Sequence, residues 1–183
     1  MSRPAVHLKP HDPRWVVDYE CEPAAIRMAV SDVFVGMYHI GSTAIPGIRA
    51  KPVIDMLAVV RNVEALDARS PQVEALGYEV MEEFGIPGRR YFREDDAHGN
   101  RTHQIHAFAA CSPQIARHIA FRDFLRAHPE YAKEYDALKQ RLAALFPSDI
   151  SASTDGKDEF IARVDALAAA LPIAMVVSPR ASR

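Results

Sequence analysis

The feature that most constrains this chain is a nearly apolar segment, Pro52 to Val60, in which Asp55 is the single charged residue. The pattern predicts a strand, and an unpaired charge inside such a strand would be costly to bury. Asp55 therefore needs a partner, which could be a metal ion, Lys51, Arg49 or another basic residue. On physical grounds alone, a structural ion pair with an arginine and a metal site fit the pattern equally well.

A glycine and a serine, Gly41 and Ser42, end another predicted strand, Val35 to Ile40. Backbone N–H groups and a hydroxyl at such a position can approach phosphate oxygens closely. A carboxylate on the adjacent strand can hold a divalent cation, Mg²⁺ or Mn²⁺, against the same phosphates. The alternative interpretation is a tight turn beside a strand-end aspartate. We expect Gly41, Ser42 and Asp55 to open into one shared pocket.

The remaining pattern predicts a small sheet followed by helices. A helix is expected to begin at Asp12-Pro13 and to be interrupted at Pro23. Further strands are expected at Tyr78 to Met81, Arg90 to Arg93 and His103 to Ala109, and helical turns between Val63 and Leu76. Three helices are expected to start at Ser112-Pro113, His128-Pro129 and Asp155. The fold class is therefore mixed, α/β or α+β, with a C-terminal helical layer.

Two of the expected helices carry apolar stripes that we predict to face a core. The first stripe consists of Tyr131, Tyr135, Leu138, Leu142 and Leu145, and the second of Phe160, Ile161, Val164, Leu167 and Leu171.

The length of the chain indicates the number of domains, and its charge limits the kinds of binding partner that we expect. The 183 residues fit one domain, which we place at 1–172, and we expect a mobile tail at 173–183. Lys and Arg number 22 against 24 Asp and Glu, so binding to nucleic acid or to a membrane surface is not expected. Cys21 and Cys111 stand far apart and no N-terminal apolar run precedes them, so we expect a cytoplasmic protein.

The run HIGSTAIPGIRAKPVID, from His39 to Asp55, resembles the signature of the GrpB family, a group of bacterial proteins related to nucleotidyltransferases. Segments that look like later family blocks follow in the expected order at Gly85–Phe92, Arg101–His106, Arg117–Pro129 and Gly156–Ile161. The resemblance implies a nucleotidyltransferase-like fold. It also leads us to expect a tyrosine before Gly156-Lys157, where this chain has Ser153-Thr154 and loses any ring stacking.

A nucleotidyltransferase carries two acids separated by one residue on the strand after the Gly-Ser turn. Here the corresponding residues are Asp55 and Leu57. Strand alternation puts both on one face, so Leu57 takes the place of the second metal-binding carboxylate. This departure puts ordinary two-metal transfer in doubt.

Histidines and basic residues are the other candidate site residues. His103 and His106 are three apart on a strand and point to opposite faces, and we choose His106 as a metal ligand or general base. The alternative is a hydrogen-bonded histidine in a half-buried strand. Candidates for binding phosphate are Lys51, Arg90, Arg101, Arg122 and Lys157. His118, Arg122 and Arg126 form one basic stripe, although a solvated helix face has the same pattern.

Three hypotheses follow from these residues. The leading one is a possible nucleotidyltransferase that binds a nucleoside triphosphate with Mg²⁺ or Mn²⁺. In this hypothesis, Gly41 and Ser42 hold phosphate and Asp55 holds the metal. Arg101, His106 and Lys157 surround the cleft. The acceptor of the nucleotidyl group is unknown. The second is a non-catalytic domain that binds a nucleotide or another phosphorylated small molecule. The third is a protein-interaction domain. The sequence does not predict the oligomeric state.

Overall fold

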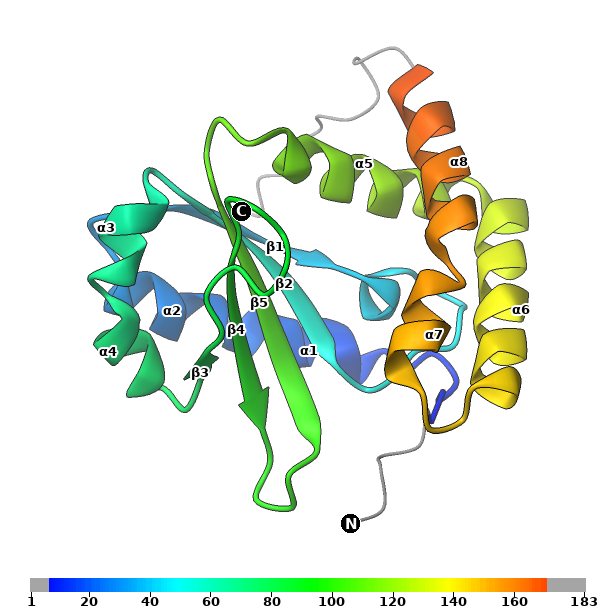
Figure 1. The fold of residues 1–183 in the computed structure, drawn as a ribbon, viewed down its shortest axis with the longest axis horizontal. Coiled ribbons are helices and arrows are strands. Elements are labelled where there is room, and N and C mark those ends of the chain that lie inside the picture. Colours follow the sequence, from blue (N-terminus) through cyan, green and yellow to red (C-terminus); the bar gives the residue numbers. More distant parts are fainter. Residues whose placement is uncertain (1–6, 171–183) are drawn as a thin grey trace.

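A five-stranded mixed sheet organises residues 7–170, the part of the chain that the computed structural model describes (Figure 1). Its strands are β1 (Phe34–Ile40), β2 (Ile54–Val60), β3 (Glu79–Val80), β4 (Arg90–Asp95) and β5 (Arg101–Ala109). The strand order is β1-β2-β5-β4-β3, in which β2 and β5 are parallel and the other neighbours are antiparallel. Each strand expected from the sequence is present.

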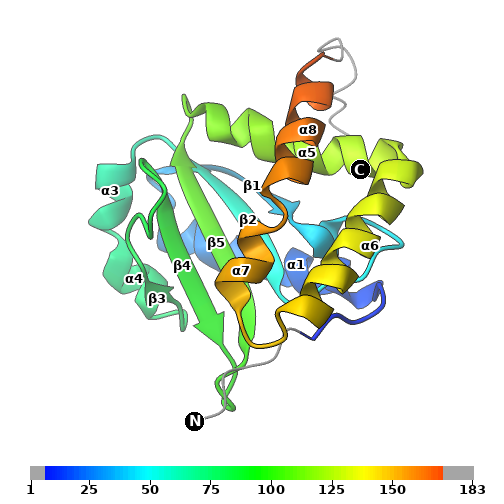
Figure 2. The same ribbon diagram turned by 45° about the vertical axis from the view of Figure 1, so that its right-hand side comes forward.

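Helices cover both faces of this sheet (Figures 1 and 2). One face packs against α1 (Arg14–Cys21), α2 (Pro23–Ala29), α3 (Val63–Asp67) and α4 (Ser70–Glu74). The opposite side carries α5 (Pro113–Ala127), α6 (Pro129–Leu145), α7 (Ile150–Asp155) and α8 (Asp158–Ala170). A short 3-10 helix, η1 (Ser42–Ala44), follows β1. The C-terminal helical layer is therefore present as predicted.

Side-chain alternation along β2 determines which residues reach which layer. Ile54, Met56, Ala58 and Val60 belong to the core beneath α1–α4. Leu57 packs on the other side, with Ile40 and Phe108, under α5. Asp55 shares this second face with Leu57, as the alternation predicted.

The capping residues and prolines in the sequence predicted most helix starts to within about one residue of their observed positions. The Oδ1 of Asp12 accepts from the Arg14 N–H at 2.9 Å, and α1 begins at Arg14, slightly later than expected. Ser112 caps α5 by accepting from the Gln114 N–H, and α6 begins at Pro129.

The prediction of a helix start at Asp155 was wrong, because Asp155 is the last residue of α7. Helix α7 was missed because its six residues are too few to show a period. It begins where Asp149 Oδ1 accepts from the Ala152 N–H at 3.0 Å, and α8 starts at Asp158.

The two predicted apolar stripes face the core only in part. Tyr135, Leu142, Phe160 and Val164 are buried. Leu145 is the last residue of α6 and is 63% exposed. Leu167 is 36% exposed although the next residue, Ala168, is buried, so Leu167 lies at the edge of the buried face of α8. Leu171 and the predicted tail at 173–183 lie outside the described residues. Within residues 7–170, no helix has both the length and the apolar character that crossing a membrane requires.

Replacing Phe160 by alanine tests how α8 is held. Phe160 is 5% exposed and its ring stacks on Tyr135 at 5.1 Å between centroids. We expect Phe160→Ala to lower the free energy of unfolding by about 3 kcal/mol, measured by urea denaturation. Leu167→Ala on the same helix serves as the control and should cost less than about 1 kcal/mol. Equal losses in the two variants would contradict this account of the helical layer.

Candidate functional site

The turn after β1 brings Gly41 into direct contact with Asp55. Ile40 lies opposite Asp55 in the antiparallel register of β1 and β2, so the next residue passes over the aspartate side chain. Gly41 has φ of 70°, and a Cβ built on it would lie 2.4 Å from Asp55 Oδ2. Both the backbone conformation and the space therefore require glycine. We refer to Gly41 and Ser42 as the Gly-Ser corner.

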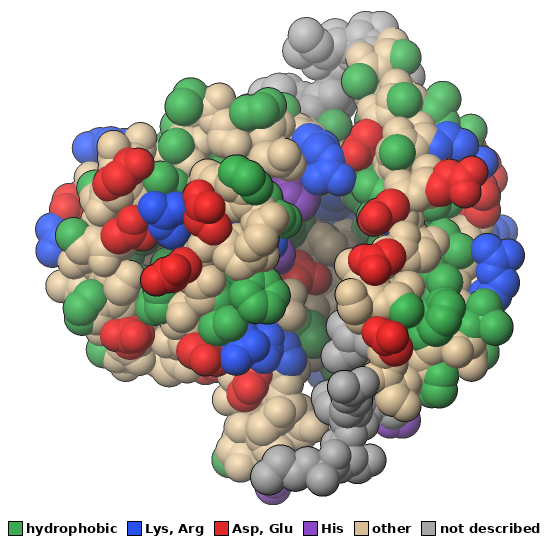
Figure 3. Space-filling view, in the orientation of Figure 1, with side chains coloured by type: hydrophobic (Ala, Val, Ile, Leu, Met, Phe, Trp, Pro, Cys, Tyr) green, Lys and Arg blue, Asp and Glu red, His purple; other side chains and the backbone are tan. Residues whose placement is uncertain are grey.

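A cavity of about 280 Å³ opens beside this corner. The residues that matter for its chemistry are Gly41, Ser42, Lys51, Asp55, Lys139 and Lys157, and we call it the lysine cavity. The surface is hollowed between the sheet and helices α7 and α8 (Figure 3). The structure thus brings the Gly-Ser corner, Asp55 and two of the predicted basic residues into one pocket, and their roles in binding remain predictions.

Lysine charge dominates the cavity. Among the described residues that line it, three lysines face a single carboxylate. Burial lowers the pKa of Lys51 and of Lys157, and the charge of Lys51 lowers the pKa of Lys157 further. Burial also lowers the pKa of Lys139 to about 8. A bound anion would favour the charged form of all three, so the site is suited to an anion with several charges.

Lys139 is fixed from two sides. Its Nζ donates to the Arg49 carbonyl oxygen and lies 4.9 Å from the centre of the Tyr135 ring. The sequence analysis missed this residue because α6 otherwise shows a regular apolar stripe. The signal that could have found it is a lysine spaced four residues after Tyr135, on the face of the helix that the stripe occupies.

Asp55 is not paired with an arginine in the described chain, which rejects the structural ion pair considered above. Arg49 instead pairs with Asp136, with Nη1 and Oδ2 at 2.9 Å. The Asp55 side chain is 27% exposed, and its Oδ1 lies 3.6 Å from His106 Nε2. The carboxylate therefore lines the lysine cavity and is partly open to it.

Leu57 leaves no place for a second metal-binding acid. Its side chain is completely buried against Ile40 and Phe108, beneath Ile115 and Ile119 of α5. Across residues 7–170, no group of three or more His, Cys, Asp or Glu side chains is arranged to hold a metal ion. A cation at Asp55 would therefore need most of its other ligands from a bound molecule and from water.

A hydrogen bond from Arg89 fixes the ring of His106. Arg89 Nη1 lies 3.3 Å from His106 Nδ1. A guanidinium can only donate, so Nδ1 accepts and the proton of the neutral ring is on Nε2, which faces Asp55. This arrangement leaves neither ring nitrogen with a free lone pair toward Asp55, which argues against His106 as a metal ligand or general base.

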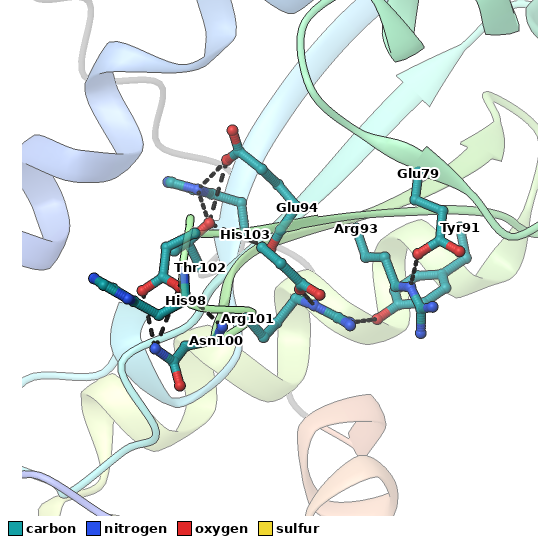
Figure 4. Close-up of polar contacts among 11 residues, drawn as sticks. Glu79, Tyr91, Arg93, Glu94, His98, Asn100, Arg101, Thr102 and His103 are labelled. Atoms are coloured by element: carbon teal, nitrogen blue, oxygen red, sulfur yellow. Dashed lines mark hydrogen bonds and ion pairs between the residues drawn. The ribbon is translucent and has the colours of Figure 1, made fainter. Parts of the chain in front are cut away.

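His103 points to the opposite face, as its spacing from His106 predicted. Its Nδ1 lies 2.7 Å from Glu94 Oε2 and 3.0 Å from Thr102 Oγ1 (Figure 4). It therefore takes no part in the candidate site.

Three predicted phosphate ligands lie outside the lysine cavity. Arg90 is on the other face of the sheet and pairs with Asp67 at 2.5 Å. Arg101 pairs with Asp95 near the β4–β5 turn, with Nη1 3.4 Å from the Tyr91 hydroxyl (Figure 4).

Arg122, the third, donates to the His39 carbonyl oxygen at 2.9 Å and to Asp123 at 2.7 Å. Of the basic stripe on α5, His118 and Arg122 are partly buried, whereas Arg126 is exposed. Within it, burial lowers the pKa of His118 to about 4 and also lowers the pKa of Arg126. Arg122 is thus engaged by protein groups and lies outside the lysine cavity, and a role of the stripe in binding a ligand stays a prediction.

His39 supports the Gly-Ser corner from beneath, a role the sequence analysis missed although His39 opens the signature run. Its Nε2 lies 2.9 Å from Thr43 Oγ1, and the Thr43 hydroxyl donates to the Val53 carbonyl oxygen at 3.3 Å. His39 Nε2 must therefore be the donor. The ring stacks on Tyr19 at 4.8 Å, and burial lowers its pKa to about 4.

Comparison with known proteins identifies the family. The family model described as GrpB protein matches residues 5–166. This chain belongs to the GrpB family. The Bacillus subtilis protein YqkA is 43% identical over 152 residues, which are 82% of this chain and 43% of YqkA. A UPF0157 protein of Pseudomonas aeruginosa is 37% identical, over 87% of this chain and 66% of its own length. The chain thus spans less than two thirds of both relatives.

Solved structures support the family assignment and show which other proteins have a similar fold. The crystal structure of conserved protein GrpB from Enterococcus faecalis superposes with a TM-score of 0.83 at 37% identity, covering 88% of this chain and 96% of that chain. Terminal uridylyl transferase 4 from Trypanosoma brucei with bound CTP gives a TM-score of 0.52 at 14% identity, covering 97% and 58%. The second likeness concerns the fold alone. The predicted family and nucleotidyltransferase-like fold are confirmed.

A methyl group at Gly41 tests its contact with Asp55. Gly47 has a similar φ of 81°, but a Cβ there would meet nothing within 4 Å. We expect Gly47→Ala to cost about 1 kcal/mol from backbone strain alone and Gly41→Ala to cost clearly more, because its Cβ also displaces the Asp55 carboxylate. Urea denaturation of both variants measures the difference. Equal losses would show that the close approach is absent.

Acid pH should weaken the fold through His39. Its pKa in the folded state, about 4, lies below the ordinary value of 6.5, so the unfolded chain binds the extra proton between these values. Stability is therefore greatest above pH 6.5 and declines as the pH falls toward 4. His39→Gln can still donate to Thr43 without titrating, so its urea midpoint should decline less over this range. His118 acts in the same direction, so part of the decline should remain.

Proposed function

We propose that this protein binds a nucleoside triphosphate together with one divalent cation, Mg²⁺ or Mn²⁺. The observation that carries the proposal is that three lysines and one aspartate line a single cavity together with the Gly-Ser corner. Backbone N–H groups and the Ser42 hydroxyl would bind phosphate oxygens, and the lysines would supply charge-assisted donors.

A polyphosphate matches the cavity better than a single phosphate does. The three ammonium groups exceed the charge of Asp55 by two, and burial makes this excess unfavourable without a bound anion. A triphosphate offers enough charge for both the lysines and a cation. The structural neighbour with bound CTP supports a nucleotide as the carrier of these phosphates.

The cation would arrive with the nucleotide. Mg²⁺ usually keeps several waters and binds through one or two carboxylates plus substrate phosphates. Asp55 supplies one carboxylate in the described chain, which is enough for a cation that the triphosphate already holds. This role does not require His106 as a ligand.

The same geometry supports binding better than nucleotidyl transfer. Leu57 removes the second acid, and the hydrogen bond from Arg89 leaves His106 without a basic nitrogen toward the site. Both parts would be needed for a two-metal reaction with a general base. We therefore favour the non-catalytic interpretation.

Thermal unfolding with the four triphosphates and Mg²⁺ tests the proposal. A ligand that binds only the folded state stabilises it by about 2.7 kcal/mol at a hundred times its Kd. We expect Lys157→Met to weaken triphosphate binding about tenfold or more, because a charge-assisted contact is lost. The exposed Lys133→Met is the matched control and should bind as the wild type does.

The metal role needs its own pair of variants. Asp55→Asn should remove the part of triphosphate affinity that depends on Mg²⁺, and the exposed Asp18→Asn should keep it. Absence of stabilisation by every triphosphate would overturn the proposal. Release of pyrophosphate on adding cell extract, lost in Asp55→Asn, would show that the protein transfers a nucleotidyl group as well.

A further inference from the structure

Phe84 presents an aromatic ring at the surface on the loop between β3 and β4. Its side chain is 58% exposed although its φ is 43°, a value that bulky residues rarely adopt. Glu82, two residues earlier, also has a positive φ, of 52°. Burial of the Phe84 ring does not explain this conformation. The hydrogen bond from Arg89 to the Phe84 carbonyl oxygen helps to hold the loop, and more than half of the side chain stays at the surface.

A continuous series of rings leads from Phe84 to Asp55. The Phe84 ring stacks on Tyr91 with centroids 5.3 Å apart and an interplanar angle of 27°. Tyr91 is 5.3 Å from His106, whose Nε2 is 3.6 Å from Asp55 Oδ1. One face of Phe84 is therefore occupied by Tyr91, and the surface ring is connected to the candidate site through side-chain contacts.

An unpaired cation lies within this series. Arg89 is 6% exposed, and in the described chain no carboxylate forms an ion pair with it. Its Nη2 and Nε donate to the carbonyl oxygens of Phe84 and Glu83 at 2.8 and 3.2 Å, and its Cζ lies 4.9 Å from the Tyr91 centroid. By contrast, Arg90, Arg93 and Arg101 each have an acidic partner.

We propose that Phe84 is the stacking platform for the base of a second nucleotide, whose phosphate would lie at the surface in the electrostatic field of Arg89. The phosphate would not contact the buried guanidinium, whose nitrogens bond to Glu83, His106 and Phe84. Aromatic side chains stack on any base, and an uncompensated guanidinium favours an anion. The loop couples the two parts, because the carbonyl group of Phe84 itself binds Arg89. The inference rests on the proposed function in placing this nucleotide beside an occupied lysine cavity.

Titration of AMP into protein saturated with a non-hydrolysable triphosphate analogue and Mg²⁺ tests the platform. We expect isothermal titration to show AMP binding that weakens about tenfold in Phe84→Ala and persists in Phe84→Trp. Phe146→Ala removes another ring, 36% exposed at the end of α6, and should leave AMP affinity unchanged. Ribose 5-phosphate, which lacks a base, should bind more weakly than AMP and equally to wild type and Phe84→Ala.

AMP binding that is absent, or unaffected by Phe84→Ala, would overturn the platform. Thermal unfolding confirms that each variant is folded before it is titrated. Failure of the proposed function has a different result, namely that the triphosphates do not bind at all. In that case AMP is titrated into protein without the analogue. Binding that depends on Phe84 and is unchanged in Lys157→Met would then support the stacking platform independently of the proposed triphosphate site.

Discussion

The close approach of Gly41 to Asp55 is the contact on which the candidate site depends. The antiparallel register sets Ile40 opposite Asp55, and the absence of a side chain at Gly41 lets the turn continue across the carboxylate. Any other residue would separate the turn from the acid. The support beneath the turn is equally specific, because His39 and Thr43 link the end of β1 to the segment that leads into β2.

The helical layer explains both what the site contains and what it lacks. Helix α6 supplies Lys139 and the turn between α7 and α8 supplies Lys157, which makes this wall of the cavity cationic. Helix α5 covers the neighbouring position on β2 with Ile115 and Ile119, so that Leu57 belongs to a core. An acid in that position would have to be buried among apolar side chains, at a large cost in desolvation. The loss of the second carboxylate therefore fits the way the layer packs.

Sequence patterns predicted the features that depend on residues close together in the sequence. The strands, the shared face of Asp55 and Leu57, and the opposite directions of His103 and His106 all follow from alternation along one strand. Arg90, Arg101 and Arg122 could not be placed in this way, because their partners Asp67, Asp95 and the His39 carbonyl are chosen by tertiary structure. Arg89 escaped notice for the same reason, since a single cation in a loop has no distinguishing pattern, whereas Lys139 stood in the apolar stripe of its helix and could have been found.

The walls of the lysine cavity come from two parts of the fold, the sheet side and the C-terminal helical layer. Asp55 lies on β2 and Lys51 in the segment before it. Lys139 lies on α6 and Lys157 in the turn between α7 and α8, beside helices that pack in a different apolar cluster. A polyanion bound between them would attract the lysines on both sides. Without it, the positive charges of these lysines repel one another, so the free energy of unfolding should depend on whether the cavity is occupied.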